Sequence, residues 1–213
     1  MLKIFAAIVF LGLLSGCASA VPISTPLLSR EYPEGLVGEK KVLLTGFQTQ
    51  AGKCFREEIE VYLRESKGFA VLTSPEPLDD RQLEKVIEGQ KVNFVLSGDV
   101  DRYEAGSNAK DRNLTVGYFT AFIITAPIAF FYAASTDWKG YALASAKMSV
   151  VDTKTDETIW SLKDSTSINE QGNELVSDDK IKKALLPIAC KNLVTKMLNN
   201  FMRSYATNKR KND

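Results

Sequence analysis

The strongest constraint on the fold is a period-two pattern over residues 140–151, where small or apolar side chains occupy every second position. Successive side chains of a strand point to opposite faces, so this pattern predicts a strand with one buried face. A second strand is predicted over residues 157–167, and residues 152–156 between them carry Asp and Thr side chains suited to a turn. Together these segments predict a β-hairpin. The expected buried positions are Ala142, Ala144, Ala146, Met148 and Val150.

The region before this hairpin switches between strand and helix periods. Short apolar runs predict strands over residues 41–47, 69–73 and 92–103, and Gly98 in the third run indicates a bulge or a close approach of another group. Phe55, Ile59, Tyr62 and Leu63 share one face of a predicted helix over residues 52–67. A shorter helix is expected to run to Glu88, with Asp79 or Asp80 as its cap and Leu83, Val86 and Ile87 facing inward.

A final helix is predicted from Ser177 or Asp178 to about Tyr205. An apolar stripe at helical spacing supports it: Leu186, Cys190, Leu193, Met197 and Phe201. Pro187 lies inside this helix and removes one backbone donor, so we expect a kink or a break near residues 184–187.

The order of these elements predicts an α/β fold. We expect a single mixed sheet flanked by helices, with a hydrophobic insertion before a C-terminal β-hairpin and a final long helix. The predicted domain covers residues 41–206. Residues 17–40 contain Pro, Ser and Gly without periodicity and are expected to form an extended tether, and residues 207–213 form a basic tail.

The first 16 residues have the pattern of a secretory signal peptide, with Lys3 followed by an apolar run and small residues at Ser15 and Gly16. The segment Leu14–Cys17 resembles a bacterial lipobox, which implies that Cys17 becomes an acylated N-terminus. The alternatives are an ordinary signal peptide with a chance cysteine or an uncleaved anchor. The resemblance, with Ala18 in place of an aspartate after the cysteine, implies an outer-membrane protein that is lipid-anchored and faces the periplasm.

The composition excludes several classes of function. The first 16 residues contain one charge, Lys3, so the remaining chain has equal numbers of basic and acidic residues. It therefore lacks the excess of positive charge that is typical of nucleic-acid-binding proteins. The chain has no histidine, so Ser–His and Cys–His nucleophilic sites are impossible. No phosphate-binding or paired-cysteine motif is present, and we expect no cofactor, no metal and no catalytic residue. A carboxylate-dependent hydrolase is an alternative, although the adjacent acidic pairs fall in or at the start of predicted helices.

Two cysteines remain if Cys17 is acylated. Cys54 lies in the first predicted helix and Cys190 on the apolar stripe of the last one. The periplasm is oxidising, and these helices could pack on the same face of the sheet, so a disulfide is one reading. The other reading is two buried free thiols, because free cysteine is among the most buried residue types.

Residues 113–136 contain no charged side chain. The segment approaches the length of a membrane helix, but it contains Pro127 and joins two predicted strands of one sheet, which argues against a single crossing. We expect an exposed apolar loop that contacts the membrane or neighbouring subunits, rather than buried segments that cover the sheet. The expected contact residues are Tyr118, Phe119, Phe122, Ile123, Ile124, Ile128, Phe130, Phe131, Tyr132 and Trp138.

Two segments carry a resemblance to a known family. FVLSGDVDRYE and VVDTKTDETIW are similar to the pattern "hydrophobic-G-x-V … V-x-D-x-x-T-x-x-x-x-W" of periplasmic lipoproteins in the CsgG, PelC and LpoB group, whose fold is like the N-terminal domain of TolB. The family turn usually has glycine where this chain has Asp156. The matching residues are Gly98, Val100, Asp152, Thr155 and Trp160.

The resemblance implies a non-enzymatic component of the envelope. We expect an accessory or structural subunit of an export or assembly complex that binds a protein partner and forms a homo-oligomer. An activator or adaptor of a peptidoglycan synthase is the alternative binding function.

Overall fold

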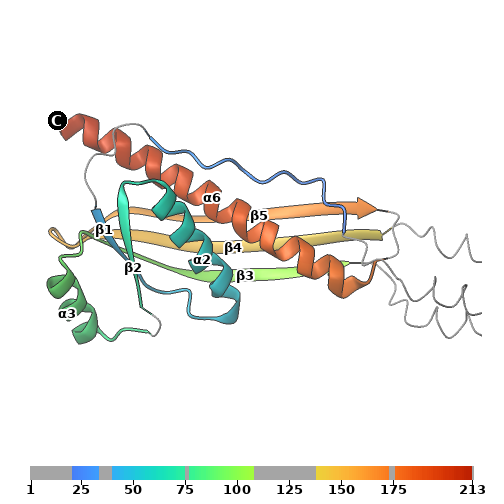
Figure 1. Cartoon of the computed structure of the whole chain (residues 1–213), viewed down its shortest axis with the longest axis horizontal. Coiled ribbons are helices and arrows are strands. Elements are labelled where there is room, and N and C mark those ends of the chain that lie inside the picture. The colour runs from blue at the N-terminus through green and yellow to red at the C-terminus, as the bar shows by residue number, and fades with distance from the viewer. Residues whose placement is uncertain (1–20, 34–39, 75–76, 108–137, 173–175, 213) are drawn as a thin grey trace, which may run out of the picture.

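The computed structural model describes residues 21–33, 40–74, 77–107, 138–172 and 176–212. Within these residues it forms a five-stranded sheet in the order β2-β1-β3-β4-β5 with three helices (Figure 1). The strands are β1 (Lys40–Leu44), β2 (Phe69–Thr73), β3 (Phe94–Ser107), β4 (Trp138–Asp152) and β5 (Glu157–Gly172). The helices are α2 (Gln50–Glu65), α3 (Asp80–Gln90) and α6 (Asp178–Asn212).

The sheet is mixed, as the sequence predicted. β1 pairs in parallel with β2 and β3, whereas β3, β4 and β5 are antiparallel. The predicted hairpin is formed by β4 and β5, and Asp156 in its turn has a left-handed φ of 55°. The predicted α/β fold class, with its final long helix, is therefore confirmed.

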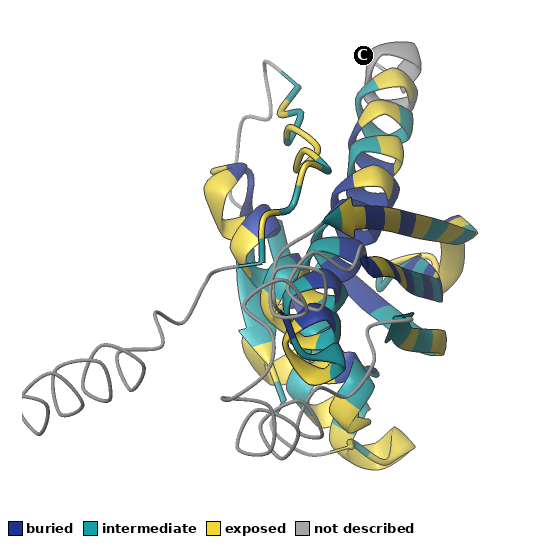
Figure 2. Ribbon diagram, turned by 90° about the vertical axis from the view of Figure 1, so that its right-hand side faces the viewer, coloured by how far each residue is buried: buried dark blue, intermediate teal, exposed yellow. Residues whose placement is uncertain are grey.

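The main core lies between the sheet and the pair α2 and α6. All five predicted positions of β4, from Ala142 to Val150, are buried in it. Small side chains on β4 allow α6 to approach closely. A Cβ atom at Gly140 would lie 2.5 Å from Ile181 of α6. Figure 2 shows the resulting alternation of buried and exposed residues along the strands.

The opposite face of the sheet differs between its two halves. Leu43 of β1 and Val95 of β3 are buried there, outside the main core cluster. The right-handed β2–α3–β3 connection places α3 on this face. On β5 the same face carries exposed polar residues: Ser161, Lys163, Ser165, Ser167, Asn169 and Gln171.

Gly98 provides a close approach and not a bulge. A Cβ atom there would lie 2.3 Å from the ring of Phe47. The irregularity in the ladder falls between Val100 and Arg102. β3 also extends to Ser107, beyond the predicted end at residue 103.

Of the kink or break expected near residues 184–187, the break is wrong. α6 is one continuous helix that contains Pro187 and extends to Asn212, beyond the predicted end near Tyr205. Leu185 and Ala189 are buried on either side of the exposed Pro187, so tertiary packing holds both sides of the proline in one helix. In the part of the chain that the structure describes, no helix is both long and apolar enough to cross a membrane.

Candidate functional site

Residues 21–33, here called the strap, form an extended segment that lies along α6 (Figure 1). The strap is extended, as the sequence predicted for this region, but it is bound to the domain. It begins near the end of β5 and follows α6 towards the C-terminus, since its successive residues contact Glu170, then Asn192, then Asn199. Side chains from α2, α6 and β5 hold it, and these contacts define the candidate site.

Two asparagines of α6 bind the strap backbone in the same way. Asn192 accepts a hydrogen bond from the Leu28 amide (2.9 Å) and donates one to the Pro26 carbonyl (3.1 Å). Asn199 accepts from the Glu31 amide (3.0 Å) and donates to the Ser29 carbonyl (3.0 Å). Each side-chain amide thus pairs with the strap as a neighbouring β-strand would.

The spacing of the two asparagines matches the geometry of an extended chain. Seven residues of α-helix rise about 10.5 Å, the distance of two turns. Three residues of extended chain, from Leu28 to Glu31, span about 9–10 Å. The two amide pairs can therefore bind a straight segment in register, and any extended backbone would satisfy them.

Glu170 of β5 fixes the beginning of the strap. Its carboxylate accepts hydrogen bonds from the amide and hydroxyl of Ser24 (3.1 and 2.7 Å) and from the amide of Thr25 (2.5 Å). The Thr25 hydroxyl also donates to it. Burial of Glu170, which is 5% exposed, would by itself raise its pKa, but the hydrogen bonds from Thr25 and Ser24 outweigh this and lower the pKa.

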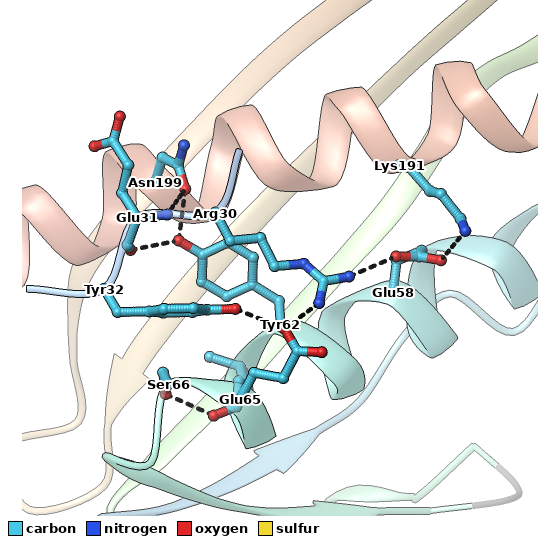
Figure 3. Close-up of polar contacts among 10 residues, drawn as sticks. Arg30, Glu31, Tyr32, Glu58, Tyr62, Glu65, Ser66, Lys191 and Asn199 are labelled. Carbon is cyan, nitrogen blue, oxygen red and sulfur yellow. Dashed lines mark hydrogen bonds and ion pairs between the residues drawn. The ribbon is translucent and has the colours of Figure 1, made fainter. Parts of the chain in front are cut away.

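Arg30 joins the strap to the acidic face of α2 (Figure 3). Its guanidinium lies 3.1 Å from the Glu58 carboxylate and also pairs with Glu65. Lys191 of α6 approaches the other oxygen of Glu58 at 3.4 Å. The Tyr32 hydroxyl donates to Glu65 at 2.8 Å, and the hydrogen bonds from Arg30 and Tyr32 lower the pKa of Glu65.

Tyr62 of α2 lies beneath the strap at the point where both helices meet it. Its hydroxyl is 2.9 Å from the Glu31 carbonyl and 2.6 Å from Oδ1 of Asn199, and burial raises its pKa. The Glu31 side chain forms two hydrogen bonds with Arg203, at 2.7 and 2.6 Å. The bond from Arg203 lowers the pKa of Glu31.

A disulfide joins the two helices that hold the strap. Cys54 of α2 and Cys190 of α6 are bonded, with their Cα atoms 6.5 Å apart. The sequence left two possibilities open, a disulfide or two buried free thiols, and the structure contains the disulfide. It links the helices close to Asn192 and Glu58, so it fixes the relative position of the side chains that contact the strap.

One row of residues marks the end of the sheet where the strap begins. Ser107 of β3 pairs with Gly140 of β4, which pairs with Glu170 of β5. The Ser107 hydroxyl donates to Asp178 at the start of α6 (2.6 Å). The chain leaves the described fold after Ser107 and re-enters it at Trp138, so these two residues and the beginning of the strap lie at the same end of the sheet.

Most of the expected site residues lie outside the described part of the chain. These are Cys17, the signal peptide and the contact residues of the insertion from Tyr118 to Tyr132. Trp138 is described, and its expected role in membrane or subunit contact is wrong. It is 1% exposed and belongs to the core, because β4 already begins at this residue and turns its side chain towards α6.

Several members of the adjacent acidic pairs have structural partners. Asp79 caps α3 and forms a capping box with Gln82. Asp178 and Asp179 form ion pairs with lysines one turn later in α6. Among the described residues, no group of three or more Cys, Asp or Glu side chains is arranged to hold a metal ion.

Neither the attachment of the strap nor the residues that bind it were predicted from the sequence. The strap has no apolar periodicity, and its partners are distant in sequence. One signal was available: Asn192 and Asn199 are polar residues seven apart beside the buried stripe of α6, and Asn192 is 6% exposed. A buried amide at such a position requires a hydrogen-bonding partner.

No protein-family model matches the chain, and no curated protein matches it. Among solved structures, protein XCC0632 from Xanthomonas campestris, of the family DUF330, is similar with a TM-score of 0.52 and 8% identity, over 89% of this chain and 99% of that one. PelC from Paraburkholderia phytofirmans, a dodecamer, has a TM-score of 0.44 and 16% identity over 82% and 94%. A minor lipoprotein from Acinetobacter baumannii has a TM-score of 0.39 and 12% identity over 80% and 92%. At these identities, the match to XCC0632 shows that the two proteins share a fold.

Proposed function

We propose that this chain is a bacterial envelope lipoprotein, anchored to the outer membrane through Cys17 and facing the periplasm. In this role it acts without catalysis, as an accessory or structural subunit of an export or assembly complex. Its partners are the membrane, a protein of that complex and further copies of itself. The lipobox-like segment and the absence of histidine from the chain support this proposal.

The observation that carries the proposal is the position of the strap. Ser24 is bound at Glu170, and it follows Cys17 by seven residues, which span at most about 25 Å when fully extended. An acyl anchor on Cys17 would thus hold the end of the sheet near Glu170 close to the bilayer. Ser107 and Trp138, which flank the segment that contains the apolar residues 113–136, lie at that same end, and we propose that this segment meets lipid or the neighbouring subunits of an oligomer.

The acyl anchor can be tested directly. Mass spectrometry of the mature N-terminus should find acylated Cys17, and Cys17→Ser should leave an unprocessed precursor or a soluble periplasmic protein. The matched control is Cys54→Ser with Cys190→Ser, which removes the other two cysteines and should retain the lipid. Normal processing and membrane retention of Cys17→Ser would contradict the proposal.

The role of the insertion needs a separate test. Replacement of Phe122 and Ile123 by aspartate should leave the fold intact and abolish membrane insertion or oligomers. The control is Ser165→Asp with Ser167→Asp on the exposed face of β5, which adds the same charge elsewhere. Loss of folding in the first variant alone would mean that the insertion belongs to the core and that the proposed contact surface is wrong.

A further inference from the structure

The strap is attached to the domain almost entirely by side-chain hydrogen bonds and ion pairs. Within the described residues, no backbone–backbone hydrogen bond joins it to the sheet or the helices. Val21 and Ile23 pack against the core at its beginning, but Leu27 and Leu28 are 57% and 47% exposed. Most of the strap therefore buries little apolar surface, although its ordering costs conformational entropy at every residue.

The surface beneath the strap is suited to contact with water. It is formed by polar side chains of α2 and α6: Glu58, Tyr62, Glu65, Asn192, Asn199 and Arg203. Water can replace the strap at each of these groups, so detachment leaves none of them without a partner. The Glu170 carboxylate of β5 loses its four hydrogen bonds from Ser24 and Thr25 on detachment and must be hydrated in their place. The disulfide and the apolar contacts of α6 hold the two helices together without the strap. The domain can thus remain folded when the strap leaves it.

We infer that the strap is a releasable latch that sets the distance between the lipid anchor and the domain. The inference rests on the proposed anchoring at Cys17. With the strap bound, Val21 already packs against the core, so the free connection is the four residues from Cys17 to Val21, at most about 14 Å. With the strap released, the connection extends to Lys40 at the start of β1, and its 23 residues span at most about 80 Å. Release lets the same domain leave the membrane surface and reach a partner deeper in the periplasm.

The test uses the full lipidated chain on vesicles that contain acceptor-labelled lipid. A donor dye is attached to Asn169→Cys, an exposed position on β5 next to Glu170. With Cys17 acylated and the other two cysteines bridged, this is the only free thiol. Time-resolved energy transfer then separates domains held near the membrane from domains that have moved away.

Two variants release the strap from opposite sides. Asn192→Ala with Asn199→Ala removes both amide pairs, and Leu28→Pro removes one donor from the strap without altering the domain. The control is Asn200→Ala, since Asn200 also lies on α6 but bonds Trp160 instead of the strap.

We expect wild type and Asn200→Ala to show mainly high transfer with a minor low-transfer population. That population should increase by about tenfold or more in both release variants. A wild-type chain without a low-transfer population would overturn the latch, as would equal transfer in all four proteins. If the chain does not bind vesicles, the proposed anchoring at Cys17 is wrong, and the latch is tested separately. Hydrogen exchange of the Leu28 and Glu31 amides is then measured, and exchange only through global unfolding of the domain would overturn the latch.

Discussion

The two sides of α6 hold their neighbours by different means. Towards the sheet, Leu185, Leu193 and Met197 bury apolar surface against strands, a contact that depends on area and shape. Towards the strap, Asn192 and Asn199 form directed hydrogen bonds to one extended backbone. The apolar side therefore determines whether the domain folds, and the polar side determines whether the N-terminal segment remains attached to it.

The disulfide supports both sides, and its removal should have the largest effect. It closes a loop with a sequence separation of 136 residues. Cys54→Ser with Cys190→Ser should lower the free energy of unfolding by about 5 kcal/mol in the chain-entropy treatment. Denaturant unfolding of the variant and of oxidised wild type measures this difference. An unchanged free energy would mean that the bridge does not constrain the unfolded chain.

Leu193 and Asn192 are adjacent in α6 but face different neighbours, so substitutions at these two residues test the two sides separately. Leu193→Ala should lower the free energy of unfolding by about 2–5 kcal/mol, because Leu193 is fully buried in the core. Local opening of the strap, measured by amide exchange, should be almost unaffected. A variant that detaches the strap as strongly as it unfolds the domain would show that the two contacts are coupled.

Asn192→Ala should have the opposite effect to Leu193→Ala, because it should weaken attachment of the strap more than it lowers the free energy of unfolding. It removes one amide pair, so strap docking should weaken by about 1–2 kcal/mol, with a smaller change in global unfolding. The exchange rate of the Glu31 amide, whose acceptor Asn199 is unchanged, measures docking in this variant, and Asn200→Ala again serves as the control. A Glu31 amide that exchanges as slowly as in wild type would show that Asn192 does not contribute to docking.

Acid should release the strap while the apolar core remains. The pKa values of Glu31, Glu65 and Glu170 are lowered in the docked state. Their contribution to docking is therefore complete above the ordinary carboxyl pKa of 4.5 and is lost as the pH falls through the lowered values. The groups that contact these carboxylates are Arg203 for Glu31, Arg30 and Tyr32 for Glu65, and Ser24 and Thr25 for Glu170. The Tyr62 hydroxyl contacts the backbone carbonyl of Glu31, which does not titrate.

Strap amide exchange as a function of pH measures this release, after correction for intrinsic rates. The effect should be the smallest of those predicted, since two of the three carboxylates lie near the surface and are screened by water. If the protection of the strap amides were constant from pH 7 to about 3, the ionised carboxylates would not contribute to docking of the strap.

The difference between the two sides also explains what could be predicted from the sequence. The alternation over residues 140–151 and the apolar stripe of α6 reflect burial, so the mixed sheet, the hairpin and the final helix were predictable. The order of the strands in the sheet was not predicted. Continuity of α6 at Pro187 was not, because packing of Leu185 and Ala189 overrides a local preference. The strap could not be found from periodicity, since its contacts join Ser24 to Glu170 and Glu31 to Asn199 across most of the chain.

We infer that the strap is held separately from the core. The most direct measurement is hydrogen exchange in increasing denaturant, comparing the Leu28 and Glu31 amides with the amide of Val150 in β4. We predict that both strap amides exchange faster and with little dependence on denaturant, as expected for a local opening that exposes little surface. Val150 should exchange only through global unfolding. Equal protection and equal denaturant dependence at all three amides would show that the strap is an inseparable part of the domain and would contradict the account.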